Sequence, residues 1–342
     1  MFTWTGSVVT VQRLQMAIIG TVSVFAMAYL GRLVGGIRAG LLAAGATAVY
    51  VNVWVNDGLV MAETLTFLLV TLITISVLRS IAEPSPGRFA CIGFLCASAA
   101  LTRAELVILV PLIALLATFE LRRRDRAGTV VNVVALIAVF CAVVSPWVIW
   151  NQIRFDGPAF LSTNDGLTLA GANCDRTYFE DIGGWDLWCA YAVPVPDDAD
   201  PAEASAIMRK AGLDYWRQNL DQYPKVAVAR LARVFSFGYL GSSAHSATAE
   251  GRPIWLTHIG NLQYWSMIPL AMVGFRRRTT SSDRFVLLGT VPLVVVVGLV
   301  ANAYVRFRVP SEVGLVVLAS LGADFLWTSA RRTLSVRRPI SA

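Results

Sequence analysis

The stretch that decides the fold runs from Phe89 to Phe119 and reads FACIGFLCASAALTRAELVILVPLIALLATF. It is apolar except at its centre, where Arg103 and Glu105 stand in the sequence TRAE. A charged side chain in the middle of a membrane-spanning helix costs roughly 2.5–3.5 kcal/mol even on the lenient insertion scale. We therefore predict a hairpin of two short helices whose apex carries both charges near the membrane surface.

The composition of the whole chain indicates a membrane protein. Of its 342 residues, 56% are hydrophobic and only 15% are charged, whereas a soluble domain carries about a quarter charged residues. The apolar runs match the roughly 17–25 residues that a helix needs to cross a bilayer. The predicted fold class is an all-α membrane protein with about nine transmembrane helices and one extracytoplasmic segment of roughly 100 residues that contains helices.

The predicted spans are the longest apolar runs, and they cover residues 11–34, 36–55, 61–79, 89–101, 105–120, 128–150, 254–275, 285–303 and 310–328. They divide the chain into transmembrane helices 1–6 (1–150), the extracytoplasmic segment (151–253), transmembrane helices 7–9 (254–330) and a basic cytoplasmic tail (331–342). The connectors richest in arginine all fall on one face, which the positive-inside rule makes cytoplasmic. The net charge of +7 therefore reflects membrane topology and not a nucleic-acid partner.

This topology puts the first residues, MFTWTGSVVTVQR, outside the cell and the C-terminus in the cytoplasm. A polytopic protein seldom begins outside without a preceding span. We expect that an upstream span is missing from this sequence, and a short translocated tail is the alternative. The preference for arginine over lysine fits a GC-rich bacterial genome, so the expected location is a bacterial inner membrane.

Within residues 151–253, Asp200, Pro201 and Glu203 predict the start of a helix. A second helix is predicted over 224–237, where a valine and leucine stripe beside two arginines favours an amphipathic helix at the membrane interface. Cys174 and Cys189 flank a loop in this oxidising compartment and predict a disulfide. The alternative is two free thiols. A metal site is not favoured, because the chain has only two histidines.

Polar residues gather in four patches on the predicted outer face. They are Asn56, Asp57 and Glu63 in the first, Arg103 and Glu105 in the second, Ser162, Thr163, Asn164, Asp165 and Gly166 in the third, and Arg306 and Arg308, followed by Glu312, in the fourth. Arginines can hold a lipid-linked phosphate, because a guanidinium matches phosphate oxygens bidentately. Carboxylates can take the proton of an attacking hydroxyl. Together the patches predict a transfer site for a lipid-linked sugar.

Each patch also has a structural interpretation. Arg306 and Arg308 can anchor the chain at lipid headgroups. Asp57 and Glu63 can compensate the dipole of a helix N-terminus. Arg103 and Glu105 can form an ion pair with each other. The predicted catalytic residues are Asp57 and Glu63, and the predicted substrate-binding residues are Arg103, Glu105, Asn164, Asp165, Arg306 and Arg308.

Five stretches, in this order, resemble the C superfamily of integral-membrane glycosyltransferases, in particular the protein O-mannosyltransferases, aminoarabinose transferases and bacterial family-39/83-type enzymes. They are VQRLQMAIIGTVSVFAMAYLGRLVGGIRAGLLAAGATAVY, NDGLVMAETLTFLL, GFLCASAALTRAELVILVPLIALL, SPWVIWNQIRFDGPAFLSTNDGLTLAGANC and YVRFRVPSEVGLVVLA. The resemblance implies an inverting hexosyl- or pentosyltransferase that uses a polyprenyl-phosphate-linked sugar. The family's catalytic carboxylate lies in a first external loop that this chain lacks together with the first span, which puts the activity of this polypeptide in doubt.

The acceptor implied by the resemblance is a glycan, a lipid or a protein, and membrane lipids are the other expected partners. No cofactor is predicted, although a divalent metal stays open because the family divides on this point. A lipid flippase or transporter is the first alternative function, but neither charges near the midplane nor an internal repeat supports it. A non-catalytic membrane scaffold is the second.

Overall fold

The computed structural model describes residues 7–277, 279–300 and 304–336. These residues form fifteen α-helices and three short helical turns, and no strand occurs among them. Six stretches are long and apolar enough to cross a membrane: Val9–Val49, Ala62–Ala82, Ala104–Leu121, Arg126–Arg154, Ser282–Val300 and Val305–Thr333. The predicted all-α membrane fold is confirmed. Residues 1–6 of the expected outer tail and 337–342 of the basic tail lie outside the described residues.

The first predicted span and most of the second lie in α1 (Ser7–Val49), which consists of two helical parts separated by a kink at Gly36. Gly36 has φ +84° and ψ −176°, a backbone conformation that is essentially restricted to glycine. A Cβ at Gly31 would lie 2.9 Å from the carbonyl oxygen of Ala39 and from Cβ of Ala43. The parts of α1 before and after the bend therefore pack closely against each other.

The chain divides into two compact units, and each is described by itself. Unit 1 comprises Met1–Pro84, Trp255–Thr290 and Val309–Ala342. Besides α1, its helices are α2 (Val51–Leu59), α3 (Ala62–Ala82), most of α12 (Ile254–Arg277), α13 (Ser281–Leu288) and α15 (Val309–Val336). Within this unit α15 packs against α1 and α3, and α2 packs against α1 and α3.

Helix α12 corresponds to the predicted span 254–275, but it is not among the six apolar stretches. It carries polar residues that face protein: Thr257 and Asn261 are 1% and 2% exposed. The side chain of Gln263 bridges the break between α1 and α2, because its amide nitrogen donates to the Val49 carbonyl and its oxygen accepts from the Val51 amide, both at 2.9 Å. Gln263 of α12 thus supplies hydrogen-bond partners for two backbone groups at the break between α1 and α2.

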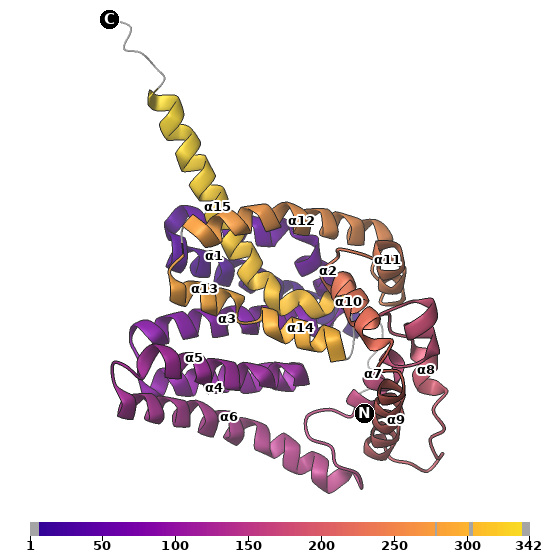
Figure 1. The fold of residues 1–342 in the computed structure, drawn as a ribbon. Helices are drawn as coiled ribbons and strands as arrows, with labels where there is room; N and C mark the ends of the chain where they lie inside the picture. Colours follow the sequence, from indigo (N-terminus) through magenta and orange to yellow (C-terminus); the bar gives the residue numbers. More distant parts are fainter. Residues whose placement is uncertain (1–6, 278, 301–303, 337–342) are drawn as a thin grey trace, which may run out of the picture. The chain divides into compact units, whose positions relative to one another are not determined.

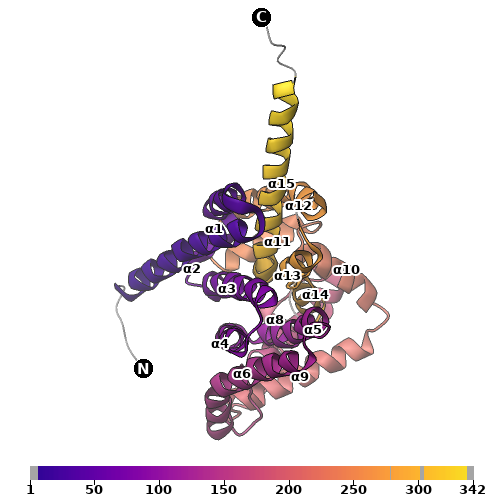
Figure 2. The same ribbon diagram turned by 90° about the vertical axis from the view of Figure 1, so that its left-hand side faces the viewer.

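Unit 2 comprises Ser85–Ile254 and Val291–Arg308. Its first part consists of α4 (Pro86–Thr102), η1 (Ala104–Ile108), α5 (Leu109–Leu121) and α6 (Arg126–Arg154). Helix α4 ends at Thr102, Arg103 is extended with φ −146°, and a helical turn starts again at Ala104. Helices α4, α5 and α6 lie side by side in Figures 1 and 2. The predicted hairpin of short helices is confirmed, with Arg103 at its apex.

Residues 151–253, predicted to be extracytoplasmic, contribute further short helices to unit 2: α7 (Asp165–Ala172), η2 (Arg176–Glu180), α8 (Leu187–Tyr191), α9 (Pro201–Gln218), α10 (Tyr223–Val234) and α11 (Leu240–Ala249). They are followed by α14 (Val291–Val300) and η3 (Val305–Arg308). Helix α9 begins as predicted. The Asp200 carboxylate accepts hydrogen bonds from the amides of Ala202 and Glu203, and the Glu203 carboxylate accepts one from the Asp200 amide. This reciprocal cap satisfies amides that a helix start leaves free.

The prediction that the second helix lies at the membrane interface is wrong. Arg230 and Arg233 of α10 are only 1% and 3% exposed, so neither side chain can reach lipid headgroups. Arg230 donates to the backbone carbonyls of Leu299, at 2.7 Å, and Ala172. Arg233 forms an ion pair with Asp181. The two arginines bind carbonyl and carboxylate groups within unit 2, which the apolar periodicity could not reveal.

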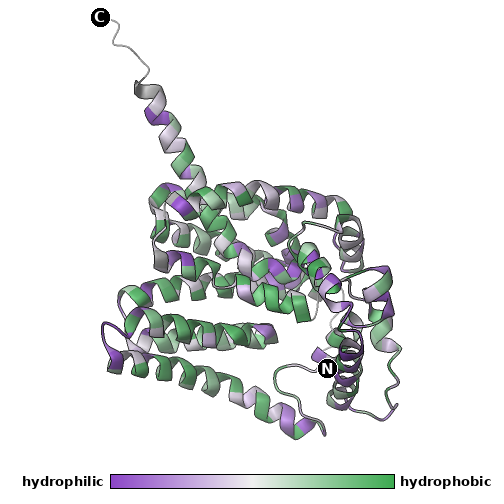
Figure 3. Cartoon of the chain, in the orientation of Figure 1, coloured by the Kyte–Doolittle hydropathy of each residue, from purple (hydrophilic) through white to green (hydrophobic). Residues whose placement is uncertain are grey.

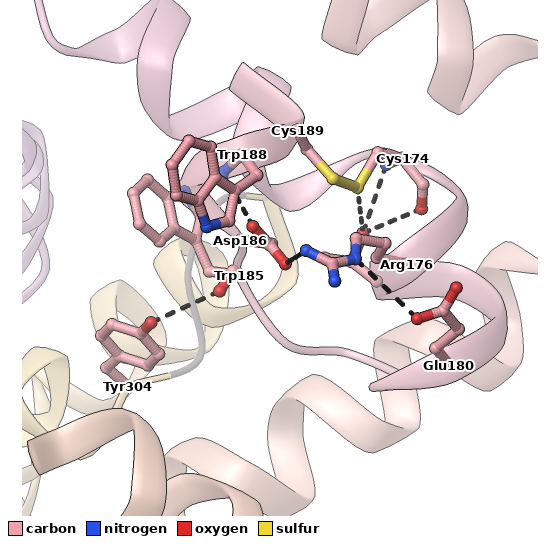
Figure 4. A network of polar contacts seen from close by, with 9 residues as sticks. Cys174, Arg176, Glu180, Trp185, Asp186, Trp188, Cys189 and Tyr304 are labelled. Atoms are coloured by element: carbon pink, nitrogen blue, oxygen red, sulfur yellow. Dashed lines mark hydrogen bonds and ion pairs between the residues drawn. A yellow bond between two sulfur atoms is a disulfide. The ribbon is translucent and has the colours of Figure 1, made fainter. Parts of the chain in front are cut away.

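The predicted disulfide between Cys174 and Cys189 is present, with 6.1 Å between the Cα atoms (Figure 4). Figure 4 also shows that Arg176, inside the closed loop, forms an ion pair of 2.7 Å with Asp186. The carboxylate of Asp186 in turn accepts from the amide of Trp188 at 2.7 Å, which caps α8. The loop is therefore held by the disulfide, by the ion pair of Arg176 with Asp186 and by the bond of Asp186 to the Trp188 amide.

Candidate functional site

Asp57 lies in the last turn of α2, between the membrane-spanning stretches that end at Val49 and begin at Ala62. The Thr64 hydroxyl donates to its carboxylate at 2.8 Å. Helix α1 approaches so closely that a Cβ at Gly20 would collide with this carboxylate. Burial raises the pKa of Asp57 from 3.8 to about 6, and the bond from Thr64 opposes the rise only in part. Asp57 is thus a half-buried carboxylate whose pKa is raised to about 6.

Glu63 occupies the first turn of α3, where the partial positive charge of a helix N-terminus favours a carboxylate. Its side chain is only 2% exposed. Glu63 therefore fits the helix-terminal interpretation better than Asp57 does. Asp57 is the better candidate to meet a substrate in unit 1.

A buried polar cluster next to this turn was not predicted. The hydroxyl of Tyr50 donates to the carboxylate of Glu312 at 2.5 Å, and Asn52 donates to the Tyr50 oxygen at 3.1 Å. Tyr50 and Glu312 are each 1% exposed. Asn56, from the first predicted patch, donates to the backbone carbonyl of Asn52 at 2.9 Å. The cluster joins the start of α2 to the start of α15 within unit 1, across a separation of 262 residues that no local pattern signals.

In unit 2, Arg103 and Glu105 form the mutual ion pair that was one of the two interpretations, with 2.6 Å between Nε and Oε1. The guanidinium of Arg103 also lies over the ring of Phe307, 4.4 Å from its centre. Such a contact between a cation and an aromatic face is attractive. The second predicted patch is thus in contact with the turn that carries the fourth.

Arg306 approaches the same ring, with its guanidinium 5.3 Å from the centre of Phe307. Its Nε lies 3.0 Å from Oε1 of Glu250, at the end of α11. The side chains of Arg103 and Arg306 are 11% and 29% exposed. Each is positioned by an ion pair and is still partly accessible to solvent. The structure therefore brings Arg103 of the second patch and Arg306 of the fourth patch together around one phenyl ring. Glu250 is a further member that the sequence analysis missed.

Arg308 has a different environment from Arg306. It is 0% exposed, and it donates to the Val234 carbonyl at 3.2 Å and to the Ser236 hydroxyl at 3.1 Å. These bonds fasten η3 to the end of α10. Arg308 is buried among protein groups of unit 2 and presents no surface to a ligand.

The third patch has its own partners. The carboxylate of Asp165 accepts from the Ser205 hydroxyl at 2.8 Å and forms an ion pair with Arg209 at 2.5 Å. These contacts join α7 to α9. Asn164 is exposed and directly precedes α7. The described contacts of Asp165 lead to α9 and not to Phe307.

No group of three or more His, Cys, Asp and Glu side chains within residues 7–277, 279–300 and 304–336 is arranged to hold a metal ion. The chemistry that the described residues offer is that of guanidinium groups and carboxylates. Arg103 and Arg306 carry the guanidinium groups that match phosphate oxygens, and both side chains are partly exposed. Asp57 can accept a proton near neutral pH.

Residues 1–150 match the family model described as Dolichyl-phosphate-mannose-protein mannosyltransferase. No curated protein and no solved structure matches the chain. The match includes Asp57, Glu63, Arg103 and Glu105. This part of the chain is therefore similar to a family of membrane glycosyltransferases. Together with the apolar helices, it indicates a multi-pass membrane protein.

Proposed function

We propose that the chain transfers a sugar from a polyprenyl-phosphate donor to an acceptor on the extracytoplasmic side of a bacterial inner membrane, with inversion at the anomeric carbon. The match of residues 1–150 is the observation that carries the proposal. The family description names a dolichyl-phosphate mannose donor, so polyprenyl-phosphate mannose is the first donor to test. The arginine-rich connectors support an N-terminus outside and a C-terminus in the cytoplasm.

Arg103 and Arg306 bind the donor phosphate in this proposal. Their ion pairs with Glu105 and Glu250 fix the positions of the two guanidinium groups, and both side chains keep some exposed surface. Transfer breaks the bond between the anomeric carbon and the phosphate oxygen, so negative charge grows on the leaving phosphate. Donors already in place stabilise that charge without reorganisation. Arg308, which is buried, is assigned to holding η3 in position.

Asp57 is the proposed proton acceptor, and this role is assigned within unit 1 alone. A base works best when its pKa lies near the working pH, and the pKa of Asp57 is raised to about 6. Glu63, although inside the matched region, is buried and stays a candidate only for support of the turn. The phosphate-binding role of Arg103 and Arg306 is assigned from contacts within unit 2, and the role of Asp57 from its surroundings within unit 1.

The test is transfer of labelled mannose from polyprenyl-phosphate mannose in membranes that contain the protein. Loss of one preorganised charge-stabilising donor typically lowers turnover about 10²–10³-fold, and Arg306→Gln is expected to fall in that range. Arg217→Gln is the matched control, because Arg217 is an exposed arginine of the same unit whose ion pair with Asp214 lies within α9. Asp57→Asn is expected to lower turnover while the amount of protein in the membrane is unchanged.

Two results would overturn these assignments. If Arg306→Gln and Arg217→Gln transfer label at the same rate as the unmodified chain, Arg306 does not bind the donor phosphate. If the unmodified chain transfers no label from polyprenyl-phosphate mannose, glucose, galactose or aminoarabinose to endogenous membrane acceptors, the proposed activity is wrong.

A further inference from the structure

A hollow of about 320 Å³ lies in unit 2 between the end of α5 and the beginning of α6. It has a polar end and an apolar side, and it is lined by Thr118, Arg122, Arg126, Thr129, Val130, Val133 and Val134. Figure 3 shows hydrophilic residues gathered at the turn between these two otherwise hydrophobic helices. The hollow therefore lies where the spans meet a polar environment.

The polar end is positively charged. The turn reads RRRDR, and Arg122 and Arg126 are the two arginines that line the hollow. Both are exposed, and within the part of the chain that the structure describes neither forms an ion pair. The acidic residue of the turn, Asp125, is occupied in capping α6, because it accepts from the Gly128 amide at 3.0 Å. An anion at this end would meet two guanidinium groups.

The apolar side runs along α6. Val130 and Val134 are each 58% exposed and lie four residues apart, so they occupy the same face of the helix. A free phosphate would use only the arginines and would leave this wall uncovered. A phospholipid uses both, because its headgroup phosphate reaches the arginines while an acyl chain covers the valines. Basic pockets between membrane helices on the cytoplasmic side are known to bind anionic headgroups.

A second hollow provides a comparison within unit 1. It has a volume of about 400 Å³ and is lined by Arg38, Asp324 and apolar residues of α1 and α15. An anion there would meet a carboxylate as well as a guanidinium. The charges of the hollow at α5 and α6 have one sign, and this favours it as the anion site.

We propose that the hollow between α5 and α6 binds one phospholipid with an anionic headgroup, whose phosphate contacts Arg122 and Arg126 and whose acyl chain lies along Val130, Val133 and Val134. This site is independent of the sugar transfer proposed above. The arginine-rich connector that carries it belongs to the face expected to be cytoplasmic.

The test measures lipid adducts of the detergent-purified, delipidated chain by native mass spectrometry, with phosphatidylglycerol or phosphatidylcholine of identical acyl chains. The unmodified chain is expected to prefer phosphatidylglycerol. Each arginine near an anionic headgroup contributes a factor of about 5, so R122Q/R126Q should weaken the preference about 30-fold. The matched control R123Q/R124Q removes the same charge from the same turn but not from the hollow, and it should keep most of the preference.

Val134→Trp leaves both arginines in place and fills the apolar side, so it should lower retention of phosphatidylglycerol and not of a soluble glycerol phosphate. Thermal melting of each variant checks that the fold is kept. An equal loss of preference in R122Q/R126Q and R123Q/R124Q would overturn the site in favour of diffuse surface charge. An unchanged preference in R122Q/R126Q, or displacement of the lipid by excess glycerol phosphate, would overturn it as well.

Discussion

The disulfide between Cys174 and Cys189 should determine how often the extracytoplasmic segment opens. The two cysteines are 15 residues apart in the sequence. In the chain-entropy account, closing a loop of that length stabilises the folded state by about 3 kcal/mol. Removing the bond should therefore raise the equilibrium constant for opening about 150-fold. The double variant Cys174→Ser/Cys189→Ser makes this change.

Trypsin cleavage after Arg230 can measure the opening. Arg230 is 1% exposed and donates to Ala172 and Asn173, directly before Cys174, so the protease reaches it only when these bonds break. When opening and closing are faster than cleavage, the cleavage rate follows the open population. The double variant should be cut after Arg230 about 150-fold faster than the unmodified chain.

Cys91→Ser is the control for this experiment, because Cys91 is an exposed cysteine without a disulfide. It should leave the cleavage rate unchanged. Reduction of the unmodified chain should reproduce the effect of the double variant. Equal rates in the double variant and the unmodified chain would show that the polar contacts hold the loop without the disulfide, and the reasoning from loop closure would then fail.

Two further predictions concern unit 1. Gly36→Ala should destabilise the protein by roughly 1–3 kcal/mol, because the φ of +84° is strained for alanine although the new Cβ meets no atom within 4 Å. Gly45→Ala, which is equally unobstructed but helical, should be neutral or stabilise by up to about 1 kcal/mol, and equal melting temperatures of the two variants would refute the strain. The pKa of Asp57 rises from 3.8 to about 6 on folding, so its contribution to stability is present at low pH and is lost as the pH rises from about 4 to about 6. The melting temperature of the unmodified chain should therefore fall across this window relative to Asp57→Asn, and a constant difference between the two would contradict the raised pKa.

The sequence predicted best what depends on neighbouring residues. The apolar stretch around Arg103 predicted a break between two short helices, because the cost of a charge in lipid leaves few alternatives. Asp200 with Glu203 predicted the start of α9, since capping requires only adjacent residues. The disulfide was also predicted correctly, because Cys174 and Cys189 flank one short loop.

Contacts between distant parts of the chain could not be predicted. Arg306 pairs with Glu250, which directly follows α11, and the pair of Tyr50 with Glu312 spans 262 residues. The stripe of α10 was interpreted as facing a membrane because periodicity shows which side is apolar, and not what covers it. Arg230 on that helix binds backbone carbonyls, which leave no trace in the amino-acid sequence.

The break at Tyr50 has a consequence for how the molecule can be divided. The family match ends at residue 150, yet the groups that bond to the break come from Gln263 and Glu312. A fragment that ends at residue 150 would lose the bond from the Tyr50 hydroxyl to Glu312 and the bond from the Val51 amide to Gln263. The residues that complete the bonding at this break thus lie beyond the matched region, so a fragment of residues 1–150 lacks them.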